Sequence, residues 1–324
     1  MKRPKIYIAV PVPKGVEDYI SQFCDYEKWE SKDQISDSEI SAKLVDKEGL
    51  LIAGGIKVNR PLLDNAPNLR VISNISVGYN NFDLIAMKER KVIGTNTPYV
   101  LDDTVADLTF GLMISVARRI SELDKLVKEG KWVSGDERTL FGTDVHHSTL
   151  GIIGMGRIGE VIAKRARFGF DMDVLYYNRS RKPDAEKRLG VKYERFDDLL
   201  KSSDFIVLTL PLTKDTYHLI DSKEFGLMKK TAIFINVSRG QTVNESALIE
   251  ALENEKIAGA GLDVYETEPV DPKNPLLNFA NVITVPHIGS ATAKTRFNMA
   301  MTAARSLVDA LSGNTPSTVV PELK

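Results

Sequence analysis

The sequence predicts an α/β protein built from two doubly wound parallel sheets, each covered by helices. Short runs rich in β-branched residues alternate with amphipathic stretches at helical spacing, which is the pattern of strands joined by crossover helices. The 324 residues exceed one ordinary core and suit two domains. The content of 43% hydrophobic and 27% charged residues is typical of a folded globular chain.

The expected strands are short and apolar, as strands buried on both faces are. In chain order they span residues 5–10, 50–53, 71–75, 150–153, 174–177, 205–209, 232–236 and 282–285. Apolar residues at helical spacing predict one long helix over 103–129, ending at Gly130, and another over 292–311. We expect residues 1–99 with 289–324 to form one domain and residues 100–288 the other, with a ligand site between them.

Composition excludes several classes of protein. The net charge of −1 gives no basic surface for nucleic acid or for an anionic membrane. No apolar run is long enough to cross a bilayer, and the apolar start is too short for a signal peptide. Cys24 is the only cysteine, which excludes an internal disulfide and fits the cytoplasm. One cysteine and four histidines argue against a structural zinc site, and we expect no metal.

A glycine motif follows the strand expected at 150–153. Gly154, Gly156 and Gly159 form a G-x-G-x-x-G pattern between this strand and an amphipathic helix. The first glycine permits a tight turn, the second lets a pyrophosphate approach the helix N-terminus, and the third lets helix and strand pack closely. In this strand-turn-helix context the motif predicts dinucleotide binding, although methyltransferases also use glycine loops.

The loop after the next strand predicts which dinucleotide binds. An NAD enzyme has Asp or Glu there to bind the adenosine ribose hydroxyls, but this chain has Asn178. Arg179, Ser180, Arg181 and Lys182 follow it. Without the acid nothing repels a 2′-phosphate, and the cations and hydroxyl offer charge-assisted donors. We therefore expect NADPH to bind in preference to NADH; the alternative is a solvated basic loop.

Three polar residues follow later strands, where doubly wound folds hold their ligands. Arg239 offers a planar fork for a carboxylate, His287 a proton donor and Glu268 a partner that favours the protonated imidazole. Together they supply what reduction of a 2-keto acid needs. Singly, each has an ordinary alternative: a surface arginine, a structural histidine and a loop glutamate. The other histidines, His146, His147 and His218, we expect on the surface.

These motifs resemble the D-isomer-specific 2-hydroxyacid dehydrogenase family over nearly the whole chain. The resemblance is closest to its glyoxylate/hydroxypyruvate reductase and 2-ketogluconate reductase branch. Beyond the segments above it includes residues 77–83, 96–98, 104–107 and 117–119. It implies a flavodoxin-like substrate domain, a Rossmann cofactor domain, and a homodimer joined through the cofactor domain. It also implies reduction of a small 2-keto acid to the D-2-hydroxy acid.

The resemblance also implies roles for individual residues. Arg239 would anchor the substrate, His287 would donate the proton, and Glu268 would be its partner. Asp263 would contact the nicotinamide carboxamide. The remaining residues implied for the substrate are Val77, Gly78 and Ser290, and those implied for the cofactor are Thr104, Arg157, Ile158, Pro211, Thr216, Val237 and Gly289, with Arg239 and His287 contacting both. Separately, Gly54 and Gly55 leave room for a larger substrate, unless they only form a tight turn.

Other interpretations remain open. Phosphoglycerate dehydrogenases are similar, but many carry a C-terminal regulatory domain and only 37 residues follow His287 here. Formate dehydrogenases need no proton donor and resemble a pattern with Gln beside the histidine, so Glu268 argues against them. A methyltransferase would leave the Arg-Glu-His set unexplained. A dinucleotide-sensing corepressor of the same fold is a binding protein that can keep all three residues, and the sequence does not exclude it.

Overall fold

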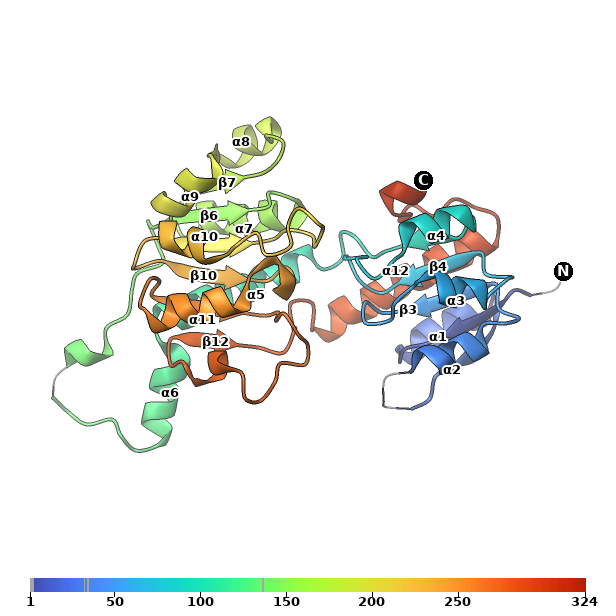
Figure 1. Ribbon diagram of the computed structural model, residues 1–324, viewed down its shortest axis with the longest axis horizontal. Helices are drawn as coiled ribbons and strands as arrows, with labels where there is room; N and C mark the ends of the chain where they lie inside the picture. The colour runs from blue at the N-terminus through green and yellow to red at the C-terminus, as the bar shows by residue number, and fades with distance from the viewer. Residues whose placement is uncertain (1–2, 32, 34, 136) are drawn as a thin grey trace. The chain divides into compact units, whose positions relative to one another are not determined.

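The computed structural model describes residues 3–31, 33, 35–135 and 137–324 (Figure 1). The chain forms two compact units, one running up to Leu101 and including Thr292–Lys324, the other Asp102–Ala291. Each unit is a parallel sheet with helices on both faces, so the predicted fold class is confirmed. Within the described part of the chain, none of the helices combines the length and apolar character needed to span a bilayer.

The first unit has a five-stranded parallel sheet in the order β2-β1-β3-β4-β5. This is the flavodoxin-like order, which reverses direction between β1 and β3. Its strands are β1 (Lys5–Ile8), β2 (Asp25–Lys28), β3 (Gly49–Ile52), β4 (Val71–Asn74) and β5 (Ile93–Thr95). β1, β3 and β4 are almost wholly buried, which explains why their sequences are nearly continuous apolar runs.

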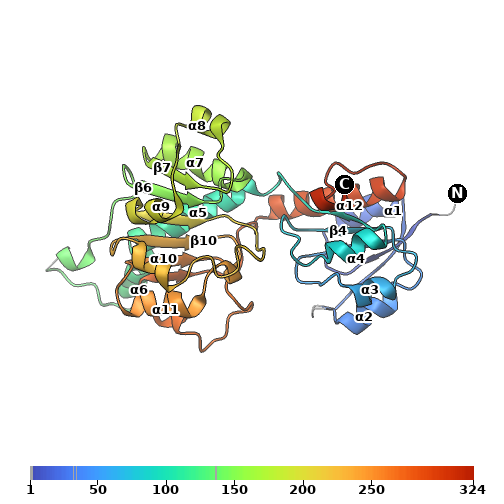
Figure 2. The same cartoon turned by 45° about the horizontal axis from the view of Figure 1, so that its top comes forward.

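Helices cover both faces of this sheet (Figures 1 and 2). One face packs against α1 (Lys14–Ser21) and α12 (Ala293–Leu311). α12 begins at the N-cap Thr292 and is fastened to β4, where Ser73 Oγ donates to the carbonyl of Ala303 at 2.7 Å. The other face packs against the shorter helices α2 (Asp37–Lys43), α3 (Arg60–Asp64) and α4 (Leu84–Glu89). The last turn of the chain, η4, spans Pro321–Leu323.

The second unit has a seven-stranded parallel sheet in the order β12-β11-β10-β9-β6-β7-β8. Counted from the other edge, the strands β8-β7-β6-β9-β10-β11 follow the strand order of the dinucleotide-binding fold. The switch point of that fold lies between β6 and β9. The strands are β6 (Thr149–Ile153), β7 (Asp173–Tyr177), β8 (Lys192–Tyr193), β9 (Phe205–Leu208), β10 (Ile233–Asn236), β11 (Gly259–Leu262) and β12 (Val282–Thr284).

Helices also cover both faces of the larger sheet (Figure 1). α5 (Asp102–Ala117) and α7 (Arg157–Gly169) pack together on one face, with α8 (Pro183–Leu189) beside α7. The opposite face carries α9 (Phe196–Ser202), α10 (Ser222–Leu227) and α11 (Glu245–Glu253) over an apolar core. Short turns η1 (Glu137–Leu140), η2 (Gly240–Thr242) and η3 (Pro275–Asn278) complete the unit.

The single helix expected over 103–129 is wrong: the structure has two helices, α5 and α6 (Ile120–Lys128). Arg119 takes a left-handed conformation at φ 53° and ends the first helix. Its guanidinium donates to the carbonyl of Thr139 at 2.7 Å, and the amide of Thr143 donates to the last carbonyl of α5, Ala117, at 2.8 Å. The returning chain therefore supplies the contacts that stop α5, and no local pattern predicts them.

Candidate active site

The glycine loop joins β6 to α7 in the expected way. Gly154 has φ 108°, and a Cβ there would lie 2.9 Å from the carbonyl carbon of Thr209. A Cβ on Gly159 would collide with the carbonyl oxygen of Gly154. Gly156 caps α7, and no described atom lies within 4 Å of where its Cβ would be. The loop thus leaves open space at the N-terminus of a 13-residue helix, as a pyrophosphate needs.

The residue after β7 fastens this strand to the glycine loop. The amide of Met155 donates to Asn178 Oδ1 at 2.8 Å, and the amide of Gly154 donates to the carbonyl of Tyr177 at 3.0 Å. Asn178 therefore holds the glycine loop in addition to its expected role, which is to leave a 2′-phosphate unrepelled. A carboxylate at this position could accept the same hydrogen bond.

The cations after Asn178 are not equivalent. Arg181 forms two hydrogen bonds with Glu186, at 2.8 and 2.9 Å, so much of the positive charge expected from it is neutralised. Tyr176 donates to the same carboxylate at 2.6 Å. Arg179 is exposed and makes no hydrogen bond or ion pair within the described chain, and Ser180 beside it is also exposed. Arg179, Ser180 and the exposed Lys182 are thus the residues of this loop whose side-chain donors contact no other described residue.

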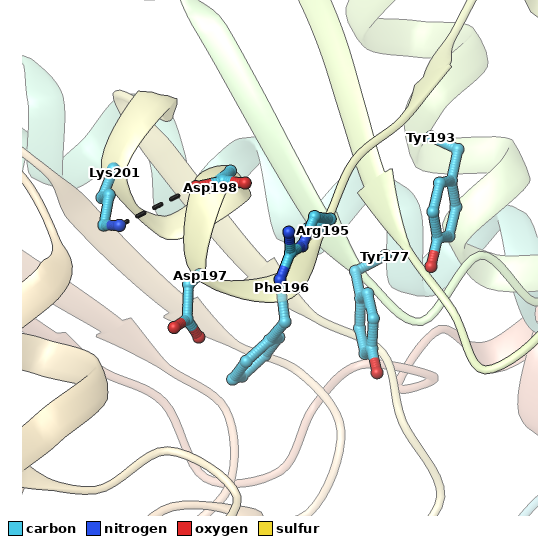
Figure 3. Close-up of a pocket in the computed structure, with 7 residues that line it drawn as sticks. All are labelled: Tyr177, Tyr193, Arg195, Phe196, Asp197, Asp198 and Lys201. Atoms are coloured by element: carbon cyan, nitrogen blue, oxygen red, sulfur yellow. Dashed lines mark ion pairs between the residues drawn. The ribbon is translucent and has the colours of Figure 1, made fainter.

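A cavity of about 470 Å³ opens near the carboxyl ends of β7 and β8 (Figure 3). Aromatic rings line one part of it and charged side chains of α9 another. The lining residues are Tyr177, Tyr193, Arg195, Phe196, Asp197, Asp198 and Lys201. Tyr177 directly precedes Asn178, so the cavity belongs to the β7 side of the sheet, whereas Arg239 and His287 follow β10 and β12 on the other side of the switch point.

Arg239 follows β10 in a turn that is fixed from two sides. Its carbonyl accepts hydrogen bonds from Asn236 Nδ2 at 3.1 Å and from Thr242 Oγ1 at 2.6 Å. Asn236 also accepts from the amide of Ser238 at 3.0 Å. The Arg239 side chain is half-buried, and burial lowers the pKa of the guanidinium while the Glu268 charge acts in the opposite direction. Arginine nevertheless stays protonated at neutral pH.

Glu268 and His287 form a close pair. Nδ1 of His287 lies 2.7 Å from Oε2 of Glu268, while Oε1 of Glu268 accepts from the amide of Tyr265 at 3.1 Å. Burial raises the pKa of Glu268, but its bond to His287, the His287 charge, the amide of Tyr265 and the Arg239 charge outweigh this effect and leave the pKa below the ordinary value. The structure therefore brings Arg239, Glu268 and His287 into one electrostatic group. Because Nδ1 is occupied, Nε2 is the nitrogen that can reach a substrate.

Asp263 holds the turn that carries His287. Its two carboxylate oxygens accept the amides of Ile288 at 2.6 Å and Gly289 at 2.9 Å. Asp263 is almost fully buried, and burial raises its pKa although these amides and the nearby His287 lower it. His287 itself has φ 52°, a strained conformation that needs such support. The resemblance implies only a cofactor contact for Asp263, so this second contact was not predicted.

In the first unit, Val77 and Gly78 lie in the loop after β4. Three hydrogen bonds fix the carbonyls of this loop. The amide of Thr97 donates to the carbonyl of Ser76 at 2.9 Å. Asn96 Nδ2 donates to the carbonyl of Val77 at 2.8 Å, and Asn74 Nδ2 to that of Gly78 at 3.0 Å. Val77 and Gly78 are half-buried residues, and their amides donate to no acceptor in the described chain. The loop therefore presents two donors of the kind a carboxylate binds.

The remaining predicted residues of the second unit lie at strand ends or helix starts. Arg157 begins α7 next to half-buried Ile158, and its Nε donates to Asp102 Oδ2 at 3.3 Å. Thr216 Oγ1 donates to the carbonyl of Pro211 at 2.7 Å, which closes the loop after β9. The others are half-buried Thr104 in α5, buried Val237 after β10, and half-buried Ser290 after β12. No three histidine, cysteine or acidic residues of the described chain converge on a metal position.

Two of the three histidines left outside the site are where we expected them. His146 and His147 are exposed in a turn before β6. His218, also expected at the surface, has a side chain that is 25% exposed, and its Nε2 lies 2.6 Å from Oε1 of Glu266, a contact that was not expected. Sequence spacing gave no sign of this pair, since 48 residues separate its members.

The fold and the strand-end residues together define a dinucleotide-dependent oxidoreductase. Residues 110–289 match the family model described as "D-isomer specific 2-hydroxyacid dehydrogenase, NAD binding domain". The chain belongs to the D-isomer specific 2-hydroxyacid dehydrogenase family, as its sequence motifs predicted. Its cofactor is a nicotinamide dinucleotide.

Relatives and solved structures cover nearly the whole chain. It is 50% identical to glyoxylate/hydroxypyruvate reductase B of Escherichia coli, over 84% of each chain, and 48% identical to that of Klebsiella pneumoniae, over 89% of each. The crystal structure of the NADPH-dependent glyoxylate/hydroxypyruvate reductase of Sinorhizobium meliloti, in complex with NADP and malonate, superposes with a TM-score of 0.89. It is 30% identical and the match covers 99% of this chain and 98% of that one.

Proposed function

We propose that this protein is an NADPH-preferring reductase that converts a small 2-keto acid to the D-2-hydroxy acid. The observation that carries the proposal is the Glu268–His287 contact of 2.7 Å at the carboxyl ends of the sheet, in electrostatic range of Arg239. A fixed cation and an oriented proton donor are what a keto acid requires of its reductase. The substrates we propose are glyoxylate, hydroxypyruvate or 2-ketogluconate, the first two because the relatives are named for them.

The residues of the chain divide the work of the reaction. Arg239 binds the carboxylate and polarises the neighbouring carbonyl, and its fixed backbone keeps the guanidinium in place. His287 donates a proton from Nε2 to the carbonyl oxygen as negative charge develops there, and Glu268 stabilises the imidazolium before the transfer. A bound reduced nicotinamide would supply the hydride to the carbonyl carbon and would itself become oxidised.

The residues around the glycine loop fit the cofactor. The space beside Gly156, the amides at the start of α7 and the donors of Arg157 and Ile158 would hold its pyrophosphate. Arg179 and Ser180 would meet the 2′-phosphate of NADPH, since Arg181 is already paired with Glu186. The related enzyme from Sinorhizobium meliloti is NADPH-dependent by its own description, which supports this preference.

The first unit supports a substrate of more than two carbons. The amides of Val77 and Gly78 would bind the substrate carboxylate. Gly54, two residues beyond β3, has no left-handed φ, and a Cβ there would meet Ser76 only at an ordinary 3.6 Å. Neither backbone nor packing therefore demands glycine at position 54. We take this as support for a pocket with room for hydroxypyruvate or a sugar-derived keto acid.

We also propose a homodimer joined through the second unit. α6 and the segment after it project from that unit in both overall views (Figures 1 and 2). This segment carries five large apolar side chains that are exposed: Ile120, Val127, Trp132, Val133 and Phe141. Exposed apolar surface of this kind typically marks an interface.

The proposal is tested by steady-state kinetics of wild type and His287→Ala. Oxidation of NADPH and NADH is measured with glyoxylate, hydroxypyruvate, pyruvate, 2-ketogluconate and 3-phosphohydroxypyruvate. We expect turnover of at least one small keto acid, and a kcat lowered about 10²-fold or more in His287→Ala while NADPH still binds. His146→Ala is the control, since this histidine is exposed in a turn.

Two results would contradict the proposal. If wild type reduces none of the five acids, the chain is better explained as a dinucleotide sensor that keeps the fold without the reaction. If only 3-phosphohydroxypyruvate reacts, it is a phosphoglycerate dehydrogenase. A near-normal kcat in His287→Ala would leave the reductase in place but assign the proton to another group.

A further inference from the structure

A second imidazole–carboxylate pair lies close to Glu268 in the sequence and in the fold. His218 Nε2 is 2.6 Å from Oε1 of Glu266, two residues before Glu268. The His218 side chain is 25% exposed and that of Glu266 32%. The proposed chemistry uses neither residue. The pair is only partly exposed, and because 48 residues separate its members it joins two loops that are distant in the sequence.

The pair closes a set of contacts among three loops, which follow the neighbouring strands β9, β10 and β11. The amide of His218 donates to the carbonyl of Gln241 at 2.9 Å. The side-chain amide of Gln241 donates to the carbonyl of Glu266 at 2.6 Å. Gln241 lies two residues after Arg239, as Glu266 lies two residues before Glu268. His218 therefore contacts both the turn that carries Arg239 and the loop that carries Glu268.

The turn that carries Arg239 and the loop that carries Glu268 are in direct backbone contact. A Cβ on Gly240 would overlap the carbonyl group of Tyr265, and the amide of Tyr265 donates to Glu268 at 3.1 Å. A shift of Glu266 would therefore move Tyr265 and, through its amide, Glu268. His218 holds φ 49°, a conformation that persists only where surrounding contacts fix the residue. Its amide and its imidazole supply those contacts.

We propose that His218 is a positioning residue, which holds Glu266 and so fixes the Glu268 loop against the Arg239 turn. This inference rests on the proposed roles of Arg239, Glu268 and His287. Misplacement of a reacting group by about 1 Å can lower a rate on the order of 10²-fold, so partial loosening by loss of His218 should lower kcat about tenfold.

The test compares His218→Ala, His218→Gln, Glu266→Ala and the double alanine variant, each assayed with NADPH and the best keto acid of the panel. We expect kcat to fall about tenfold in both single alanine variants and no further in the double variant, because they break the same contact. His218→Gln should recover most of the activity, since its amide can donate to Glu266 from nearly the same position. The dissociation constant of NADPH should stay unchanged, and His146→Ala is the control.

The pH profile separates positioning from general destabilisation. If Glu268 no longer holds His287 well, reduction should decline at a lower pH on the alkaline side in His218→Ala, as in Glu268→Gln. In His218→Gln the profile should match wild type. Partial unfolding would reduce the active fraction without moving the profile.

Several results would overturn the inference. These are a normal kcat in His218→Ala, additive losses in the double variant, or a glutamine variant as impaired as the alanine one. A loss confined to NADPH binding would assign His218 to the cofactor loop instead. Should His218→Ala fail to fold, Glu266→Ala and His218→Gln decide: the inference expects kcat about tenfold lower in the first and near wild type in the second, and the opposite result overturns it. Failure of the proposed function is distinct, because it appears in wild type as the absence of turnover of the small keto acids.

Discussion

Arg239 illustrates how the fold fixes a catalytic candidate at its backbone. Asn236 and Thr242 both donate to its carbonyl, so the turn holds its direction before the side chain meets any ligand. The half-buried guanidinium has a pKa lowered by burial, which is the energetic cost of holding a cation where water is partly excluded. A bound anion would offset that cost by pairing with the guanidinium, and we therefore expect the site to favour a carboxylate.

Arg239→Lys keeps the charge and removes the planar fork. We expect kcat/KM for the keto acid to fall about 10²-fold or more, because a lysine cannot form the paired hydrogen bonds to a carboxylate. Steady-state kinetics measure this, with Arg305→Lys on the exposed face of α12 as the control. Similar kcat/KM values in wild type and Arg239→Lys would show that the contact with the carboxylate is not bidentate.

Glu268 shows the sign of the pH dependence at this site. Its pKa lies below the ordinary value, so its contribution to stability is complete above the pKa of the unfolded chain. That contribution is lost as the pH falls through the lower, folded-state pKa. Across the neutral range the carboxylate therefore stays ionised beside the imidazole of His287.

Glu268→Gln removes that charge and keeps the shape of the side chain. We expect reduction to decline at a lower pH on the alkaline side than in wild type, because the imidazolium loses its carboxylate. The measurement is the pH profile of kcat/KM, with Glu250→Gln as the control on exposed α11 surface. Coincident profiles would separate Glu268 from the proton donor.

At the scale of elements, we expect the loop after β7 to decide between NADPH and NADH. Among the described residues of this loop, Arg179, Ser180 and Lys182 have uncommitted side chains, whereas Asn178 binds the glycine loop and Arg181 binds Glu186. One well-formed charge-assisted hydrogen bond contributes about 1.5–3 kcal/mol, and exposure of the loop reduces this. We therefore expect NADPH to be preferred about tenfold to a few tens-fold.

The double variant Asn178→Asp with Arg179→Ile should reverse this preference. The new carboxylate can still accept the amide of Met155, so the strand stays fastened while the acid repels a 2′-phosphate. The comparison is kcat/KM for NADPH and NADH at fixed ionic strength, with Lys187→Ile on exposed α8 as the control. A wild type that prefers NADH would mean that these cations form only a solvated surface.

The elements that the sequence predicts are those whose interactions are local or wholly apolar. β3, β9 and β10 were expected because every residue in them is buried. β2 was missed because it is a mostly exposed edge strand of Asp, Tyr, Glu and Lys, and β11 because Gly-Ala-Gly-Leu has no β-branched residue. No larger residue fits at positions 259 and 261, because a Cβ on Gly259 would meet the carbonyl of Asn281 and one on Gly261 would meet Leu112 of α5.

For the candidate site, the sequence likewise predicts the residue types but not the contacts that position them. Chemistry selected Arg239, Glu268 and His287, because few residue types can do what a keto acid requires. The contacts that position them join residues far apart in sequence, such as Asp263 with the amides at 288 and 289, or His218 with Glu266. Such pairs carry no periodicity, so only the folded chain shows them.

At the scale of the whole molecule, the exposed apolar surface is unevenly distributed. Five large apolar side chains are exposed between residues 120 and 141, with Trp132 at 66% and Val133 at 78%. Salt bridges on α6, such as Lys128 with Asp124, lie on the same segment and keep part of it polar. A mixture of large apolar residues and a charged rim is the composition of a protein interface.

We therefore expect the protein to be a dimer that depends on this segment. Trp132→Glu with Val133→Glu would place two charges where apolar side chains meet a second copy, and burying unpaired charges costs several kcal/mol. Analytical ultracentrifugation should show twice the mass of one chain for wild type and a monomer for the double variant at the same concentration. Val45→Glu, which adds a charge at an exposed apolar residue of the first unit, should leave the mass unchanged. A monomeric wild type, or a double variant that stays dimeric, would exclude this segment as the interface.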